Sequence, residues 1–339
     1  MIAIHKSTWG FSPDWIKYCE ENSIAFKIVN CYDSDIINQI KGCKALLWHH
    51  HHSLTKDKLF ARELLFAIEQ SGIKVFPNFN TAWHFDDKLG QKYLLEAIEA
   101  PLVPTFTFYT KKDALNWIKN TSFPKVFKLR GGAGSNNVSL INNLSQAKSV
   151  INQAFGIGFS QYNRFNDIKE NVRLLKLGKA SFFTLLKSFR RFFFSTEFAK
   201  THGREKGYLL FQEFIPNNKF DIRVITIGNK AFALKRTVRE NDFRASGSGF
   251  IIYNKEEIDI NCVKIAFETS KKLNAQVVAY DFVFDSVNNP LIVEINYGYA
   301  HKAYFDCPGY WDIGLEWHEE KFNSTNWIID LILTENDKL

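Results

Sequence analysis

The chain has 339 residues, 45% of them hydrophobic and 23% charged, which is an ordinary globular composition with enough apolar material for two or three compact lobes. The N-terminus lacks the charged start, apolar run and cleavage site of a secretory signal, and no segment has the roughly 18 to 20 uninterrupted apolar residues of a membrane-spanning helix. Five cysteines without a C-x-x-C pair fit reduced thiols better than disulfides or a zinc site. We therefore expect a cytoplasmic protein.

The net charge of +7 is concentrated in one segment. Residues 160–206 hold 11 Lys or Arg against 4 Asp or Glu, so the rest of the chain is balanced at 32 of each sign. Within this segment, residues 173–194 are cationic and rich in Phe and Leu. Packing under a neighbouring lobe, contact with a polyanionic substrate and contact with an anionic membrane all stay open for it. No recognised nucleic-acid-reading motif accompanies the charge, so we predict no nucleic-acid partner.

The first 85 residues predict alternating strands and helices. A buried strand at 45–48 is followed by a helix at 59–70 and by a strand at 73–76. Alternation of this kind predicts a small α/β domain with a parallel sheet.

Four consecutive histidines, His49, His50, His51 and His52, follow the strand at 45–48. They stand where open α/β sheets tend to bind ligands. A polar loop is the favoured interpretation and a substrate contact comes next. A metal site ranks last, because adjacent histidines on a strand point to opposite faces.

The next region predicts a helix at 87–97, a strand at 105–109, a helix at 112–119, and a hairpin with a glycine-rich tip. The hairpin strands are 124–129 and 138–141, and the loop between them contains Gly131, Gly132, Gly134 and Ser135. A glycine-rich backbone can approach phosphates closely, and Lys128 on the first strand adds a positive charge. The loop joins strand to strand and does not match G-x-x-x-x-G-K-[ST], which argues against a P-loop and a Rossmann fingerprint.

The last third of the chain predicts strands at 208–214, 221–227 and 230–236, a helix at 262–273, and a hairpin of 277–284 with 291–295. In this hairpin, Glu294 and Asn296 are two residues apart and project from one face, while Asp281 lies on the paired strand. Two carboxylates and an amide oxygen suit Mg²⁺ shared with phosphates. Acidic hairpin residues are often only solvated, but the other face of this hairpin is apolar, so we favour the metal site.

Two weaker features lie nearby. The strand that ends with Glu213 before a proline can offer backbone groups and a carboxylate to an adenine edge, and Asp221 is placed to reach ribose hydroxyls. Arg236 and Arg244 suit the stabilisation of phosphoryl-transfer charge near a metal. An ordinary strand end and an ordinary surface loop explain these features equally well when each is taken alone.

Taken in order, these segments resemble the ATP-grasp superfamily from about residue 86 to residue 296. The resemblance is closest to the branch that contains the ribosomal-protein glutamate ligase, with glutathione synthetase and D-alanine–D-alanine ligase as wider relatives. Residues 221–224, 242–244 and 294–296 carry it most specifically. Residues 204–249 are also similar to uncharacterised ATP-grasp proteins of bacterial surface-polysaccharide gene clusters.

The resemblance implies an α/β protein with an ATP-grasp fold. An N-terminal parallel-sheet domain is expected at 1–85, followed by two ATP-clasping lobes. The central lobe covers 86–215, with a lid loop at 130–137 and the basic insertion at 160–206. The C-terminal lobe covers 216–339 and carries the metal site.

The resemblance also implies ATP and Mg²⁺ as cofactors and assigns a role to each matching residue. Phosphates are expected at Lys88, Lys128 and the glycine-rich loop, and adenine at Glu213 with the backbone of Phe214 and Ile215. Ribose is expected at Asp221, Mg²⁺ at Asp281, Glu294 and Asn296, and the transferred phosphate at Arg236 and Arg244.

The implied activity joins a carboxylate to an amine through an acyl-phosphate, and a sugar acid of polysaccharide biosynthesis is one candidate carboxylate. A phosphotransferase that makes no amide and a non-catalytic nucleotide-binding regulator are the alternatives. Residues 297–301 depart from the small residues, such as Ser-Pro-Gly, that the family often has after the asparagine, so no known substrate can be carried over. A homo-oligomer stays open.

Overall fold

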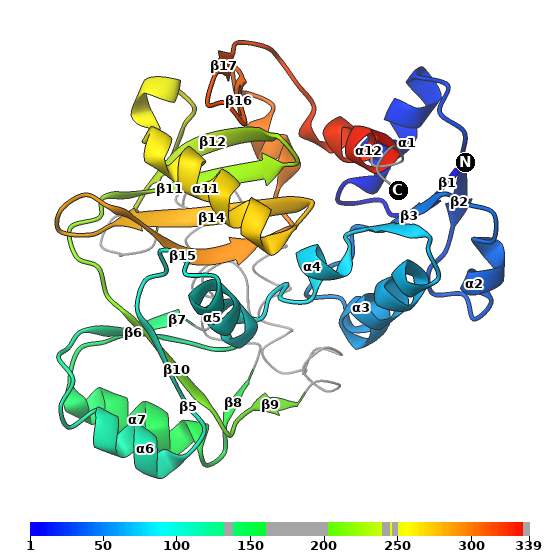
Figure 1. The fold of residues 1–339 in the computed structure, drawn as a ribbon. Helices are drawn as coiled ribbons and strands as arrows, with labels where there is room; N and C mark the ends of the chain where they lie inside the picture. Colours follow the sequence, from blue (N-terminus) through cyan, green and yellow to red (C-terminus); the bar gives the residue numbers. More distant parts are fainter. Residues whose placement is uncertain (132–137, 161–202, 239–244, 246–249, 335–339) are drawn as a thin grey trace, which may run out of the picture.

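The computed structural model describes residues 1–131, 138–160, 203–238, 245 and 250–334. They form three larger sheets and a two-stranded one, with helices packed against them (Figure 1). The predicted α/β class is confirmed, with a parallel sheet at the N-terminus and antiparallel sheets in the other lobes. The loop from Gly132 to Ser135, most of the basic segment, and Arg244 lie outside the described residues, so the expectations for them stay predictions.

The N-terminal sheet has the strand order β2-β1-β3-β4, with all neighbours parallel. Its strands are β1 (Ile2–His5), β2 (Phe26–Val29), β3 (Ala45–Leu47) and β4 (Lys74–Phe76). Its helices are α1 (Ser12–Glu21), α2 (Ile36–Gln39), α3 (Thr55–Gln70) and α4 (Phe79–Ala82). The short strands are apolar and mostly buried because helices cover both faces of the sheet.

The second sheet has the order β5-β10-β6-β7 and is antiparallel. Its strands are β5 (Thr105–Phe108), β6 (Lys125–Lys128), β7 (Val138–Ile141) and β10 (Leu209–Glu213). Helices α6 (Lys111–Trp117) and α7 (Leu144–Ala154) bury one face of it. The predicted hairpin is confirmed by the pairing of β6 with β7, and β8 (Phe159–Ser160) pairs with β9 (Arg204–Glu205) beside it.

The third sheet has the order β15-β14-β11-β12-β16-β17, with β13 paired to β12. Its strands are β11 (Phe220–Ile227), β12 (Lys230–Thr237), β13 (Ile251–Ile252), β14 (Val277–Phe284), β15 (Pro290–Asn296), β16 (Tyr310–Asp312) and β17 (Trp317–His318). Helices α5 (Lys88–Ala97) and α11 (Ile260–Leu273) contribute to the core on one face. Both predicted hairpins of this region, β11–β12 and β14–β15, are confirmed.

The other face of the third sheet changes character along its strands. At one end, Ile225 and Ala279 join the core of the N-terminal sheet and of α12 (Ser324–Thr334), which returns to pack against α1 (Figure 1). Two residues further along the same strands stand Arg223 and Asp281, which therefore lie on the same face. The apolar end of this face is thus covered by the N-terminal domain. The charged end, with Arg223 and Asp281, faces the space between the lobes instead.

None of the helices that the structure describes is long and apolar enough to span a membrane. All five cysteines are buried and unpaired, in agreement with the expectation of reduced thiols.

Candidate active site

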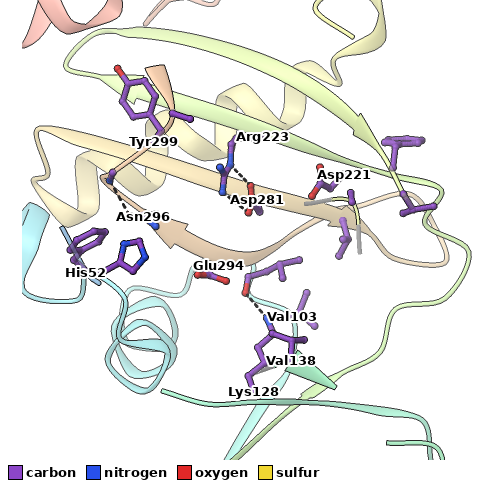
Figure 2. A pocket seen from close by; sticks show the side chains of 18 of the residues that line it. His52, Val103, Lys128, Val138, Asp221, Arg223, Asp281, Glu294, Asn296 and Tyr299 are labelled. Carbon is purple, nitrogen blue, oxygen red and sulfur yellow. Dashed lines mark hydrogen bonds and ion pairs between the residues drawn. The ribbon is translucent and has the colours of Figure 1, made fainter. Parts of the chain in front are cut away.

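A cavity of about 1370 Å³ lies between the second sheet, the third sheet and the N-terminal domain. Each of the three contributes side chains to its lining: Lys128 comes from β6, Glu294 from β15, and His52 from the segment after β3. Figure 2 shows Lys128 on one side of this space and Asp281 and Glu294 on the other. Most of the residues that the sequence predicted for the site line this one cavity: Lys128, Glu213, Phe214, Ile215, Asp221, Asp281, Glu294 and Asn296.

The acidic row is created by the register of β14 and β15. Asp281 stands directly opposite Glu294, and Asn296 stands opposite Ala279, two residues before Asp281. Directly opposed residues of an antiparallel pair share a face, so all three predicted ligands lie on the cavity side. A bulge after Asp281 leaves Val293 as the extra residue of β15, and the carbonyl oxygen of Val293 accepts hydrogen bonds from the second sheet.

The two predicted phosphate lysines meet at this row. Lys88 Nζ lies 3.4 Å from Glu294 Oε1 and 3.9 Å from Asp86 Oδ1. Lys128 Nζ donates to the Val293 carbonyl at 3.5 Å. Both ammonium groups are buried, with 6% and 5% of the residue exposed. Lys128 and Glu294 line both the large cavity and a small adjoining one, whereas Lys88 lines only the small one.

Burial affects the two lysines differently. It lowers the pKa of Lys128 to about 8, because Glu294 only partly offsets the loss of water and Lys88 adds like charge. Burial alone would lower the pKa of Lys88 as well, but the nearby carboxylates of Glu294 and Asp86 outweigh it and raise this pKa. An anion in the cavity would supply Lys128 with the negative charge that its surroundings give only in part.

Two arginines hold the acidic groups of the third sheet. Arg223 binds both oxygens of Asp281, at 2.6 and 2.8 Å, and Arg236 binds both oxygens of Asp221, at 2.7 and 2.6 Å. Arg236 also reaches Asp281 Oδ1 at 2.8 Å. Burial alone would raise the pKa of Asp281, but the two guanidinium groups lower it, so this carboxylate stays ionised. Arg236 is buried beneath Asp221 and does not itself line the cavity.

The oxygen donors on this face fit a hard divalent cation. From the residues that the structure describes, Asn296 Oδ1 accepts one hydrogen bond, that of Gly298 N at 2.9 Å, which leaves its second lone pair for a cation. Glu294 is partly exposed to the cavity. Asp281 can contribute only if an arginine shares or releases one of its oxygens. No group of three or more His, Cys, Asp and Glu side chains gathers among the residues that the structure describes, so the remaining ligands of a cation here would be amide, phosphate or water oxygens.

The predicted adenine strand, β10, ends in the cavity with Glu213, Phe214 and Ile215 in its lining. The Glu213 carboxylate is bound by Lys125 Nζ at 2.7 Å, and Lys125 is only 2% exposed. Next to it, Gln212 donates to Thr105 Oγ1 at 3.1 Å and to the Val293 carbonyl at 3.3 Å. This end of the cavity is therefore fixed to both sheets by hydrogen bonds.

Sequence reasoning missed several residues of the site. The sequence patterns assigned no role to Arg223, although its place two residues after Asp221 already puts both on one face. Outside the cavity lining, Arg130 binds Asp87 Oδ2 at 2.9 Å through Nε, which fixes the start of the glycine-rich loop to the N-cap residue of α5. Gly131 does not line the cavity; a Cβ at this position would lie 3.1 Å from Asp86 Oδ2.

The histidine run follows β3 instead of lying on it, so its members need not alternate between faces. His49, His51 and His52 line the cavity, whereas His50 is buried and its Nε2 has no hydrogen-bond partner within the described part of the chain. The backbone of the run is fixed, since Asp57 accepts from His51 N at 2.6 Å and Tyr297 donates to the His50 carbonyl at 2.9 Å.

Comparison with known proteins identifies the fold that carries this site. A family model described as a RimK-like ATP-grasp domain matches residues 197–304, about a third of the chain. The structure is similar to a RimK domain ATP-grasp protein from Sphaerobacter thermophilus, with a TM-score of 0.57 at 13% identity over 98% of this chain and 100% of that one. The chain has the ATP-grasp fold.

Two further ATP-grasp structures are similar over nearly the whole chain. The D-alanine–D-alanine ligase of Bacillus anthracis, in complex with ATP, has a TM-score of 0.54 at 12% identity and covers 98% of this chain and 94% of that one. The biotin carboxylase domain of the Hydrogenobacter thermophilus 2-oxoglutarate carboxylase, in complex with MgADP, has a TM-score of 0.60 at 12% identity, over 100% of this chain and 70% of that one. At these identities the similarity shows the fold alone.

Proposed function

We propose that the chain is an ATP- and Mg²⁺-dependent ligase that joins a carboxylate to an amine. The observation that carries the proposal is the position of Lys128 across one cavity from the row of Asp281, Glu294 and Asn296, with Lys88 paired to Glu294 from the small adjoining cavity. Buried cations opposite hard oxygen donors suit a triphosphate that shares a divalent cation with the protein. Solved structures with the same fold hold ATP or MgADP.

Each group of residues would have a distinct task. Lys128 and Lys88 would bind phosphate oxygens and hold the transferred phosphoryl group in line with the attacking carboxylate. The end of β10 would receive the adenine, and Asp221 the ribose, at the wall that Gln212 and Lys125 fix. Asp281, Glu294 and Asn296 would hold Mg²⁺, which when bound offsets the negative charge that develops on the phosphates.

The remaining steps need positioning and charge instead of a covalent enzyme nucleophile. Transfer of the γ-phosphoryl group to the carboxylate gives an acyl-phosphate, and attack by an amine then releases phosphate and forms the amide. Arg223 is placed on the same face as the acidic row, and Arg244 is expected close to it from the sequence. A guanidinium group there would stabilise negative charge on the transferred phosphate.

A coupled ADP-release screen tests this function. Carboxylates, including amino acids and nucleotide-linked uronic acids, are offered with and without amines in the presence of Mg²⁺ and ATP. ADP release that requires both a carboxylate and an amine supports the ligase. Release with an acceptor but independent of any amine supports the phosphotransferase, and nucleotide binding without turnover of any pair supports the regulator.

A further inference from the structure

One wall of the cavity is rich in histidines and aromatic residues, and its two oppositely charged residues, Asp14 and Lys302, offset each other. We call it the histidine wall, and it consists of Thr8, Trp9, Gly10, Asp14, His49, His51, His52, Phe85 and residues 298–302. It joins the loops after β1 and β3 to the turn after β15, so it begins two residues after Asn296. Figure 2 shows His52 beside Asn296 and Tyr299 further along this side. The proposed phosphate site and the histidine wall are thus neighbours within one cavity.

His49 is held more firmly than the other residues of this wall. Its ring stacks on Phe11 with centroids 3.8 Å apart and planes at 17°, and its Nδ1 accepts a hydrogen bond from Phe11 N at 3.1 Å. Two glycines leave room for it: a Cβ at Gly10 would lie 2.4 Å from Nδ1, and a Cβ at Gly298 would lie 3.3 Å from Nε2. The imidazole therefore has one orientation.

The hydrogen bond at Nδ1 also fixes where the proton is. A nitrogen that accepts from a backbone N–H carries no proton, so the ring is neutral and its proton sits on Nε2. Burial acts in the same direction, because it lowers the pKa of His49 well below the usual value. Nε2–H has no hydrogen-bond acceptor among the residues that the structure describes, although His49 is only 9% exposed and lines the cavity. The donor therefore faces the cavity in a fixed direction, where an oxygen of a bound ligand can replace water as its acceptor.

We propose that His49 binds the substrate, and that its Nε2–H donates to an oxygen of the carboxylate that accepts the phosphoryl group. This inference rests on the proposed function. His49 is close to the metal row, since Gly298 both approaches Nε2 and donates to Asn296 Oδ1. A carboxylate bound to Nε2 is thereby placed between the histidine wall and the proposed phosphate site.

The rest of the wall indicates the body of this substrate. Trp9 and Phe85 contribute partly exposed aromatic side chains to the lining, whereas the Tyr299 ring packs mainly into the core. Burial lowers the pKa of His52 to about 4, so this ring is neutral near pH 7. Asp14, which lies 2.7 Å from His301 Nε2, supplies a negative charge and Lys302 a positive one, so the wall has no net positive charge to balance a second anionic group. The substrate class is therefore a monocarboxylate carried on a ring or another flat, uncharged body.

Nitrogen NMR on protein labelled with ¹⁵N-histidine tests the donor itself, with no substrate or nucleotide present. His49 is assigned by comparison with His49→Phe. The expected spectrum shows a protonated Nε2 and a bare Nδ1 for this residue, unchanged between pH 6 and 8. A proton on Nδ1, or a ring that titrates in this range, overturns the inference about His49. Neither result bears on the proposed ligase activity.

Ligand-observed NMR then tests the substrate class in the presence of Mg²⁺ and a non-hydrolysable ATP analogue, with benzoate and glutarate as probes. Benzoate is expected to bind more tightly than glutarate, and His49→Phe is expected to weaken benzoate by about tenfold or more, the usual effect of losing a hydrogen bond to a charged group. Equal binding of both probes, or unchanged benzoate binding in His49→Phe, overturns the inference.

His5→Phe is the matched control. His5 is also buried and its Nδ1 also accepts from a backbone N–H, that of Cys31 at 3.0 Å, but it does not line the cavity. Both variants lose the same kind of hydrogen bond, so their thermal stabilities should fall alike, and only His49→Phe should lose benzoate. Equal loss in the two variants shows a structural role for His49. If the ATP analogue itself does not bind the unaltered protein, the proposed function fails instead.

Discussion

Asp281 and Glu294 stand directly opposite each other on β14 and β15, with the bulge that frees the Val293 carbonyl just beyond them. Two carboxylates this close would repel each other unless cations hold both. In the described structure Asp281 is held by Arg223 and Arg236, and Glu294 by Lys88. The two carboxylates therefore differ in their partners. Asp281 is bound by two arginines, whereas Glu294 lies 3.4 Å from Lys88, a lysine that is proposed to bind phosphate.

This difference makes Glu294 the carboxylate whose loss should affect Mg²⁺ most directly. We expect Glu294→Gln to weaken Mg²⁺-dependent binding of ATP by about tenfold or more, close to 1.4 kcal/mol or above, and to abolish ADP release. The fold should persist, because Gln keeps the volume and a hydrogen-bonding oxygen. Isothermal titration with ATP, in Mg²⁺ and in EDTA, measures the effect.

Glu268→Gln provides the comparison, since Glu268 lies exposed on α11 and carries the same change of charge. It should bind nucleotide as the unaltered chain does. An unchanged Mg²⁺ dependence in Glu294→Gln would remove this residue from the proposed metal site.

The pair of Lys125 and Glu213 predicts an asymmetric loss of stability. Lys125 is 2% exposed, whereas the Glu213 side chain is 30% exposed to the cavity. Glu213→Ala would leave a buried ammonium without its acidic partner, and we expect a cost of about 3 kcal/mol. Lys125→Met would leave only a partly hydrated carboxylate, at about 1 kcal/mol. Urea denaturation of both variants, with the exposed Lys111→Met as reference, measures the difference, and equal costs would contradict it.

The sequence revealed the parts of the site that depend on local periodicity. Glu294 and Asn296 are two residues apart on one strand, so alternation alone placed them on a common face. The same rule, applied to β11, also places Arg223 on the face of Asp221, so alternation was sufficient to include this arginine in the site. Lys128 was found because a strand and a glycine-rich loop surround it.

Other contacts depend on strand order, which local patterns do not contain. Lys125 meets Glu213 because β10 inserts between β5 and β6, although 88 positions separate the two residues in the chain. Lys128 reaches the Val293 carbonyl across 165 positions. The role of His49 depends on Phe11 and on two glycines from different ends of the chain, so four consecutive histidines looked like an ordinary polar loop.

Because several buried histidines are neutral in the folded protein, we expect the free energy of unfolding to fall in acid. Burial lowers the pKa of His5 to about 4, of His50 to about 3 and of His84 to about 4, from 6.5. Below pH 6.5 these histidines bind protons in the unfolded chain but stay neutral in the folded chain. The contribution of these residues is therefore fully present above pH 6.5 and is lost as the pH falls towards 4, at about 1.4 kcal/mol per histidine and pH unit.

Urea denaturation at several pH values measures this loss. His84→Gln removes one of the three groups, so its free energy of unfolding should fall less steeply between pH 6 and 4.5, by about 1.4 kcal/mol per pH unit. Equal slopes for the variant and the unaltered chain would show that His84 does not stay neutral in the folded state.

Two glycines around His49 should differ when each is replaced by alanine. Gly10 has a φ of +71°, and an added Cβ would lie 2.4 Å from His49 Nδ1, so Gly10→Ala should lower the free energy of unfolding by about 2 kcal/mol or more. Gly298 needs no positive φ, and its added Cβ would lie 3.3 Å from His49 Nε2. Gly298→Ala should therefore fold normally and bind the ATP analogue, yet bind benzoate less tightly, because the methyl group stands beside the N–H that the carboxylate needs. Thermal unfolding and the benzoate titration separate the two variants, and undiminished benzoate binding by Gly298→Ala would contradict the direction assigned to Nε2–H.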